Sequence, residues 1–197
     1  MKILIKLSGV LLLAFLALPS AAGTVPQKKI DVLEKAFDAT MIESANALVR
    51  RGDVAFGVCI EGYGVLFKME FMFVDPTRLQ IMEHLDDLDS LKVYWKGVLD
   101  NEKKGEEPSK RTRAQLDRIE EELVETLIDY GGTLGSLDEG EFVTVLAFPW
   151  DGEWDVWPRP VRSIRITARY GDLRAHSEGR LETDAVRSRV RIVEESK

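Results

Sequence analysis

The most regular alternation of apolar and polar residues in this chain lies in residues 54–73. After a turn at Gly62-Tyr63-Gly64, every second residue is apolar, and Lys68 and Glu70 lie between them. A period of two is typical of a strand with one buried face. Glycine reaches the positive φ that a tight hairpin turn needs. The pattern therefore predicts two strands joined by a turn at Tyr63.

The first strand of this hairpin has bulky side chains at even positions and small ones at odd positions. Small side chains allow a helix to approach a sheet closely, so we expect the odd positions to face a helix. The bulky residues are Val54, Phe56, Val58 and Ile60, and the small ones are Ala55, Gly57 and Cys59.

Apolar residues at steps of three and four predict helices on both sides of the hairpin. The first is expected over residues 26–51. Two antiparallel helices are expected after the hairpin, one from Thr77 to the charged loop 103–109 and one from about Arg111 to Tyr130. This helical hairpin packs on the sheet or stands away from it. The first helix has its apolar stripe at Ile30, Leu33, Phe37, Met41, Ala45 and Leu48.

Strand patterns return in the last third of the chain. Residues 141–149 and 161–170 are rich in β-branched and aromatic residues and predict two strands. Residues 172–177 fit a short helix. Residues 185–193 fit a strand or a helix, and their β-branched content favours the strand.

Together these elements predict one α+β domain over residues 23–197. Its sheet is expected to have four or five largely antiparallel strands. The N-terminal helix packs on this sheet, and the helical hairpin is inserted between the second and third strands.

Residues 1–22 have the pattern of a signal peptide. Lys2 and Lys6 precede an apolar run that ends at Pro19, and the small residues 20–22 suit a signal peptidase. We therefore expect export by a Sec-type signal, to the periplasm or outside the cell. The alternative is an uncleaved anchor, although the run is shorter than the roughly 20 residues of a spanning helix. A membrane partner is expected only in that case.

Charge and motifs exclude several functions. The chain has a net charge of −7, and loss of Lys2 and Lys6 with the signal peptide makes it more negative by two, so we expect no nucleic-acid partner. Cys59 is the only cysteine, and its small apolar neighbours favour a buried thiol over a nucleophile. No hydrolase, nucleotide-binding or metal-binding motif is present, and we predict no cofactor and no metal. The acid run around His84 is typical of a solvated helix face.

The first candidate binding feature is a tryptophan-rich loop. Trp150, Trp154 and Trp157 lie within eight residues and alternate with acidic residues. The tryptophans either fold back over the end of the sheet or bind a glycan or an envelope protein. Tyr63 joins this candidate site only if its turn lies at the same end of the sheet.

The second candidate is a run of arginines. From Arg159 to Val193 the chain has nine arginines and no lysine. Arginine makes paired hydrogen bonds with carboxylates and phosphates, so an arginine face would bind lipid headgroups, phosphorylated sugars or an acidic partner. Alternatively, acidic helix residues such as Glu120, Glu121 and Glu125 neutralise it. If the last two strands pair, one face would carry Arg165, Arg169, Arg187, Arg189 and Arg191.

These observations favour a non-catalytic binding or interaction protein of the cell envelope. One alternative is an envelope hydrolase whose catalytic carboxylates the sequence does not identify. Another is a membrane-tethered structural protein that oligomerises through its helical hairpin.

Overall fold

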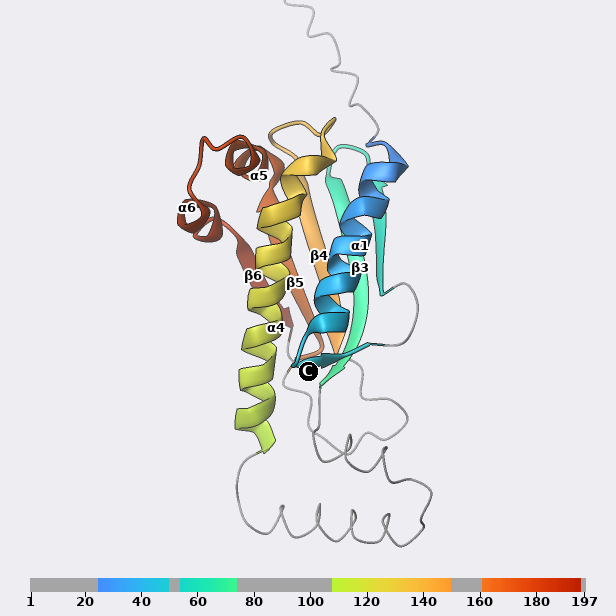
Figure 1. Cartoon of the computed structure of the whole chain (residues 1–197), viewed down its shortest axis with the longest axis vertical. Coiled ribbons are helices and arrows are strands. Elements are labelled where there is room, and N and C mark those ends of the chain that lie inside the picture. The colour runs from blue at the N-terminus through green and yellow to red at the C-terminus, as the bar shows by residue number, and fades with distance from the viewer. Residues whose placement is uncertain (1–24, 50–53, 74–107, 150–160, 196–197) are drawn as a thin grey trace, which may run out of the picture.

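The computed structural model describes residues 25–49, 54–73, 108–149 and 161–195 (Figure 1). The predicted signal peptide, the expected helix from Thr77, the acid run at His84 and the tryptophan-rich loop lie outside these residues. In chain order the elements are α1 (Gln27–Glu43), β1 (Ala47–Leu48), β2 (Ala55–Ile60), β3 (Gly64–Phe73), α4 (Pro108–Gly131), the short 3-10 helix η1 (Gly132–Leu134), β4 (Phe142–Pro149), β5 (Ser163–Arg169), α5 (Tyr170–Ser177), α6 (Thr183–Arg187) and β6 (Arg191–Glu195).

The strands form one six-stranded sheet in the order β1-β3-β4-β5-β6, and β2 also pairs with β3. The expectation of an α+β fold is confirmed. The expectation of a largely antiparallel sheet of four or five strands is wrong in detail, because β3 and β4 are parallel and the sheet is mixed. A long connection that contains a helix can return the chain in the same direction, as in a βαβ unit.

The inserted helical hairpin is also not observed as predicted. Between β3 and β4 the structure describes one helix, α4, which packs on the sheet. The first helix is shorter than expected: α1 ends at Glu43 rather than near Arg51. The hydroxyl oxygen of Ser44 accepts hydrogen bonds from the backbone N–H groups of Asn46 and Ala47 and turns the chain into β1.

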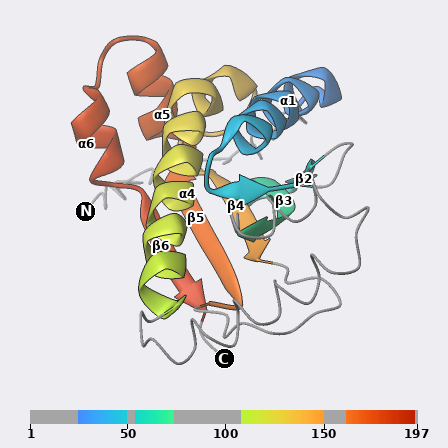
Figure 2. The ribbon, with the colours of Figure 1, turned by 60° about the horizontal axis from the view of Figure 1, so that its bottom comes forward.

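Helices α1 and α4 lie side by side over one face of the sheet, as Figures 1 and 2 show. Helices α5 and α6 contact α4, and α5 also contacts β5. The apolar stripes predicted for both long helices supply buried residues, among them Phe37 of α1 and Leu123 of α4. The sheet contributes alternate residues to this core, from Val65 to Phe71 in β3 and from Ile164 to Ala168 in β5. The core therefore lies between one helical layer and one face of the sheet.

The predicted hairpin is confirmed, and α1 holds its outer strand. Two backbone N–H groups of β2 and its flank, those of Val54 and Ala55, donate to Asp38 Oδ1 at 2.9 and 2.8 Å. The N–H of Gly57 donates to Glu34 Oε1 at 2.6 Å. These acceptors occupy N–H groups that would otherwise be free at the edge of the sheet, which protects the edge from pairing with another strand.

Helix α1 approaches β2 closely on the side of the strand that carries small residues, and Gly57 lies at this contact. A Cβ atom at this position would lie 2.5 Å from Ile30 Cγ2 and 2.6 Å from the Phe67 ring. We expect Gly57→Val to lower the free energy of unfolding by about 1–3 kcal/mol, because overpacking forces the helix away. Chemical denaturation measures this change. Gly140→Ala is the control, since its Cβ meets no atom within 4 Å, and an equal loss in both variants would contradict the explanation.

Candidate binding face

The face of the sheet opposite α1 and α4 carries exposed apolar residues on β2. Phe56 is 67% exposed, and Val58 and Ile60 are 39% and 41% exposed. All three lie on the bulky side of the strand, which points away from the helices. Contiguous exposed apolar side chains on a soluble protein mark interaction sites more often than isolated ones do. Within the described residues, α1 and α4 both lie on the other side of the sheet, so we call this side the uncovered face.

Three arginines lie at the other side of the uncovered face. Arg165 and Arg169 flank Thr167 on β5, and Arg191 of β6 is paired directly with Thr167. Arg191 is therefore the diagonal cross-strand neighbour of both other arginines, at roughly 7–8 Å between backbones. All three side chains are exposed. We call Arg165, Arg169 and Arg191 the arginine triad.

The strand register connects the two parts of the face. Phe56 is paired with Lys68, Lys68 with Leu146, and Leu146 with Arg165. Neighbouring strands lie about 4.8 Å apart, so roughly 14 Å separates the backbones of Phe56 and Arg165. The amine of Lys68 lies 2.9 Å from Glu70 and 5.6 Å from the centre of the Phe148 ring. One continuous surface thus runs from apolar at β2 to cationic at β5 and β6.

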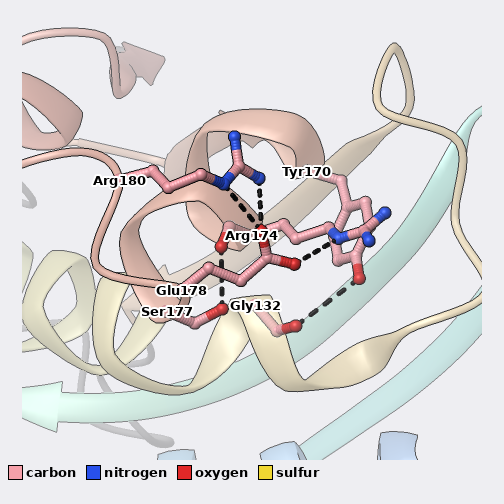
Figure 3. Close-up of polar contacts among 6 residues, drawn as sticks. All are labelled: Gly132, Tyr170, Arg174, Ser177, Glu178 and Arg180. Atoms are coloured by element: carbon pink, nitrogen blue, oxygen red, sulfur yellow. Dashed lines mark hydrogen bonds and ion pairs between the residues drawn. The ribbon is translucent and has the colours of Figure 1, made fainter.

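Other arginines of the C-terminal region have carboxylate partners. Glu178 lies between Arg174 and Arg180 at the end of α5, and both side chains donate to its carboxylate (Figure 3). Hydrogen bonds from these two arginines lower the pKa of Glu178. In the described part of the chain, none of the triad arginines has such an ion pair.

Of the five arginines predicted to share one sheet face, only the three of the triad do so. The segment expected as one strand over 185–193 is divided between α6 and the start of β6. Arg187 and Arg189 lie outside the strand and form ion pairs with Glu125 and Asp172, at 3.0 and 2.6 Å. The acidic helices thus neutralise these two arginines, as the alternative interpretation held, whereas no carboxylate of the described residues forms an ion pair with the triad.

A chain of hydroxyl groups crosses the uncovered face towards the triad. The Tyr63 hydroxyl lies 2.7 Å from Thr144 Oγ1, and Thr144 Oγ1 donates to Thr167 Oγ1 at 3.2 Å. Because the Thr144 proton is used towards Thr167, Tyr63 is the donor to Thr144. Thr144 is fully buried, and the Tyr63 ring packs against Phe142. The proton of Thr167 remains available for a further acceptor.

Tyr63 does not lie at the end of the sheet where the tryptophan-rich loop begins. Its turn precedes β3 and lies beside Phe142, the first residue of β4. The loop that contains Trp150, Trp154 and Trp157 follows Pro149, at the opposite end of β4. The start of the loop therefore lies away from Tyr63, but the tryptophans themselves lie outside the described residues, and their joint site with Tyr63 stays a prediction.

Two carboxyl groups meet on the other face of the sheet, between α4 and β6. Arg113 makes a two-pronged ion pair with Glu194, with both distances 2.6 Å. Glu120 is only 8% exposed, and its Oε1 has no hydrogen-bond partner among the described residues. Burial, followed by the negative charge of Glu194, raises the pKa of Glu120 to about 7. Arg113 lowers the pKa of Glu194. These residues attach the edge strand β6 to α4.

The described residues contain no helix long and apolar enough to cross a membrane. Within the same residues, no group of three histidine, cysteine, aspartate or glutamate side chains is placed to hold a metal ion. No known protein family, curated protein or solved structure matches the chain.

The sequence interpretation missed two parts of this face. It recognised the bulky positions of β2 but did not predict that Phe56, Val58 and Ile60 face solvent. It also missed Thr144 and Thr167, whose hydroxyls are joined only by the pairing of β4 with β5. A signal for the first was available, because small residues at odd positions already placed the helix against the opposite side of the strand.

Proposed function

We propose that the protein is a non-catalytic binding module that takes a partner on its uncovered face. The supporting observation is the presence of exposed Phe56, Val58 and Ile60 on the same sheet face as three arginines that form no ion pair with another described residue. Hydrophobic side chains supply affinity, and guanidinium groups supply orientation and selectivity for anions. A suitable partner therefore combines an apolar surface with an anionic group.

We further propose that this binding takes place in the cell envelope. The support is the signal-peptide pattern of residues 1–22 and the absence of a recognisable catalytic motif in the sequence. The paired acids Glu120 and Glu194 give little support to the alternative of a hydrolase. Arg113 forms an ion pair with Glu194, and Glu120 is buried between α4 and β6.

Site-specific photo-cross-linking tests the proposed face. A photoreactive amino acid at Phe56 or Val58 is expected to give a discrete adduct in the producing cells. The same amino acid at Val32 or Ile42 is the control, because these residues of α1 are also exposed and apolar but lie on the helical layer. Adducts of equal yield at both sets of positions, or at neither, would reject the uncovered face as the binding surface.

A charge variant provides a second measure of the same proposal. Replacing both Arg165 and Arg191 with glutamine is expected to reduce the adduct at Val58 at least tenfold, because the partner loses its anionic contacts. Arg118→Gln is the matched control. Arg118 is exposed on α4 and pairs with Glu121, away from the uncovered face. Quantitative immunoblotting of the cross-linked species measures the difference.

A further inference from the structure

The arginine triad concentrates positive charge on one part of the uncovered face. Arg191 is a diagonal neighbour of Arg165 and of Arg169, Glu195 is a diagonal neighbour of Arg165, and no described carboxylate forms an ion pair with any triad arginine. Like charges directly opposite each other on adjacent strands are destabilising, and long side chains also reach their diagonal neighbours. The remaining chain is acidic, with a net charge of −7. The cluster is therefore a local exception to the charge of the whole protein.

A hydroxyl donor lies at the centre of the triad. Thr167 is flanked along β5 by two of the arginines and is paired across strands with the third. Its oxygen already accepts a hydrogen bond from Thr144, which is itself held by Tyr63. The Thr167 proton is not used within this chain of hydroxyl groups, so it is free to donate to a ligand that lies between the triad arginines.

We propose that Arg165, Arg169, Arg191 and the Thr167 hydroxyl form a site for a phosphate group. This inference rests on the proposed function, because it names the chemical class of group that the uncovered face binds. A phosphomonoester has about −1.5 to −2 charges at neutral pH and three terminal oxygens. Three guanidinium groups and one hydroxyl supply donors for all three oxygens and positive charge for both negative charges, whereas a carboxylate has one charge and two oxygens.

The phosphate group has two possible sources, a phospholipid headgroup or a soluble phosphate compound. The exposed β2 residues lie roughly 14 Å from the triad, which suits a ligand that has an apolar part beside its phosphate. The chemistry of the site is the same in both cases. The probes are therefore inorganic phosphate and vesicles of phosphatidic acid, whose headgroup is a phosphomonoester, mixed with phosphatidylcholine, each compared with sodium chloride at equal ionic strength.

Calorimetric titration and thermal unfolding of the mature chain test the site. Inorganic phosphate is expected to raise the melting temperature beyond the effect of chloride, because it binds the folded state. The affinity is expected to fall at least tenfold in Arg191→Gln and to be lost in the triple variant R165Q/R169Q/R191Q. Arg118→Gln is expected to bind as the parent does.

Variants at the hydroxyl chain separate binding from folding. Thr167→Val is expected to weaken phosphate binding about fivefold to tenfold, whereas Thr167→Ser keeps the donor and retains affinity. Tyr63→Phe is expected to weaken binding in the parent and to have no further effect in the Thr167→Val variant. That result identifies Tyr63 as a positioning residue that acts through Thr167. A purely structural role would lower stability equally in both backgrounds.

The outcomes distinguish the two sources of the phosphate group. They also distinguish failure of the phosphate site from failure of the proposed binding face. Binding of both probes assigns a lipid headgroup, and binding of inorganic phosphate alone assigns a soluble phosphate compound. No affinity for either probe, or undiminished affinity in the triple variant, would overturn the phosphate site. Cross-linking at Phe56 and Val58 in that event would still support the proposed function. Loss of the cross-links as well would reject both proposals.

Discussion

Replacing Asp38 with alanine is expected to lower the free energy of unfolding by about 3 kcal/mol. The Asp38 carboxylate is buried and accepts two backbone N–H groups, those of Val54 and Ala55, while its other oxygen lies 3.0 Å from Lys35. Hydrogen bonds to a charged acceptor contribute roughly 1.5–3 kcal/mol each. Alanine leaves both N–H donors without that acceptor at the start of β2.

Chemical denaturation of the variant measures this loss, and hydrogen exchange locates it. Amide exchange at Val54 and Ala55 is expected to accelerate more than exchange in β4 or β5. Asp31→Ala is the matched control, because Asp31 lies on the same helix but is exposed and accepts only from Gln27. A loss below about 1 kcal/mol for Asp38→Ala would show that α1 does not hold the β2 edge through this carboxylate.

Replacing Glu120 with glutamine is expected to stabilise the protein above pH 7. The pKa of Glu120 rises from 4.5 to about 7 on folding. The folded state therefore binds more protons than the unfolded state between these values, and this contribution to stability falls as the pH rises through that window. Glutamine resembles the protonated carboxyl and removes the penalty. The stability difference between variant and parent is expected to be near zero at pH 4.5 and about 3 kcal/mol at pH 8.

Measuring unfolding of both proteins from pH 4.5 to pH 8 tests this explanation. Only the difference curve is interpreted, since other carboxyl groups also titrate in the unfolded chain. The neighbours that face Glu120 and influence it are Glu194, Asp117 and Arg113. Glu121→Gln is the control, because it removes an exposed carboxylate of the same helix. A difference curve for Glu120→Gln that does not rise with pH would refute the buried, protonated carboxyl.

Some residue patterns predicted their local structure directly. The alternation after Tyr63 correctly assigned the buried side of β3, and the alternation in residues 164–168 did the same for β5. The three- and four-residue spacing identified the buried stripe of α4 from Leu116 to Leu127. These assignments succeed because a side chain's direction follows from its position within one strand or helix.

Other features depended on contacts between distant segments. The parallel pairing of β3 and β4 was not predictable from their own residues, since the long connection permits either direction. Residues 185–193 satisfied two periodicities, and the choice followed from packing: Val186 is buried in α6, whereas β6 begins at Arg191 and pairs with β5.

The sequence by itself determined the hairpin, the apolar stripes of the helices and the concentration of arginine near the C-terminus. Only the tertiary structure decided which arginines form ion pairs with other described residues. Arg187 and Arg189 find Glu125 and Asp172 on neighbouring helices, while Arg191 lies across from Thr167 on the uncovered face. Which side of the hairpin is exposed also depends on tertiary packing. Helix α1 covers the side of β2 that carries small residues and leaves Phe56 exposed. Periodicity defines the two sides of an element, and packing decides which side is covered.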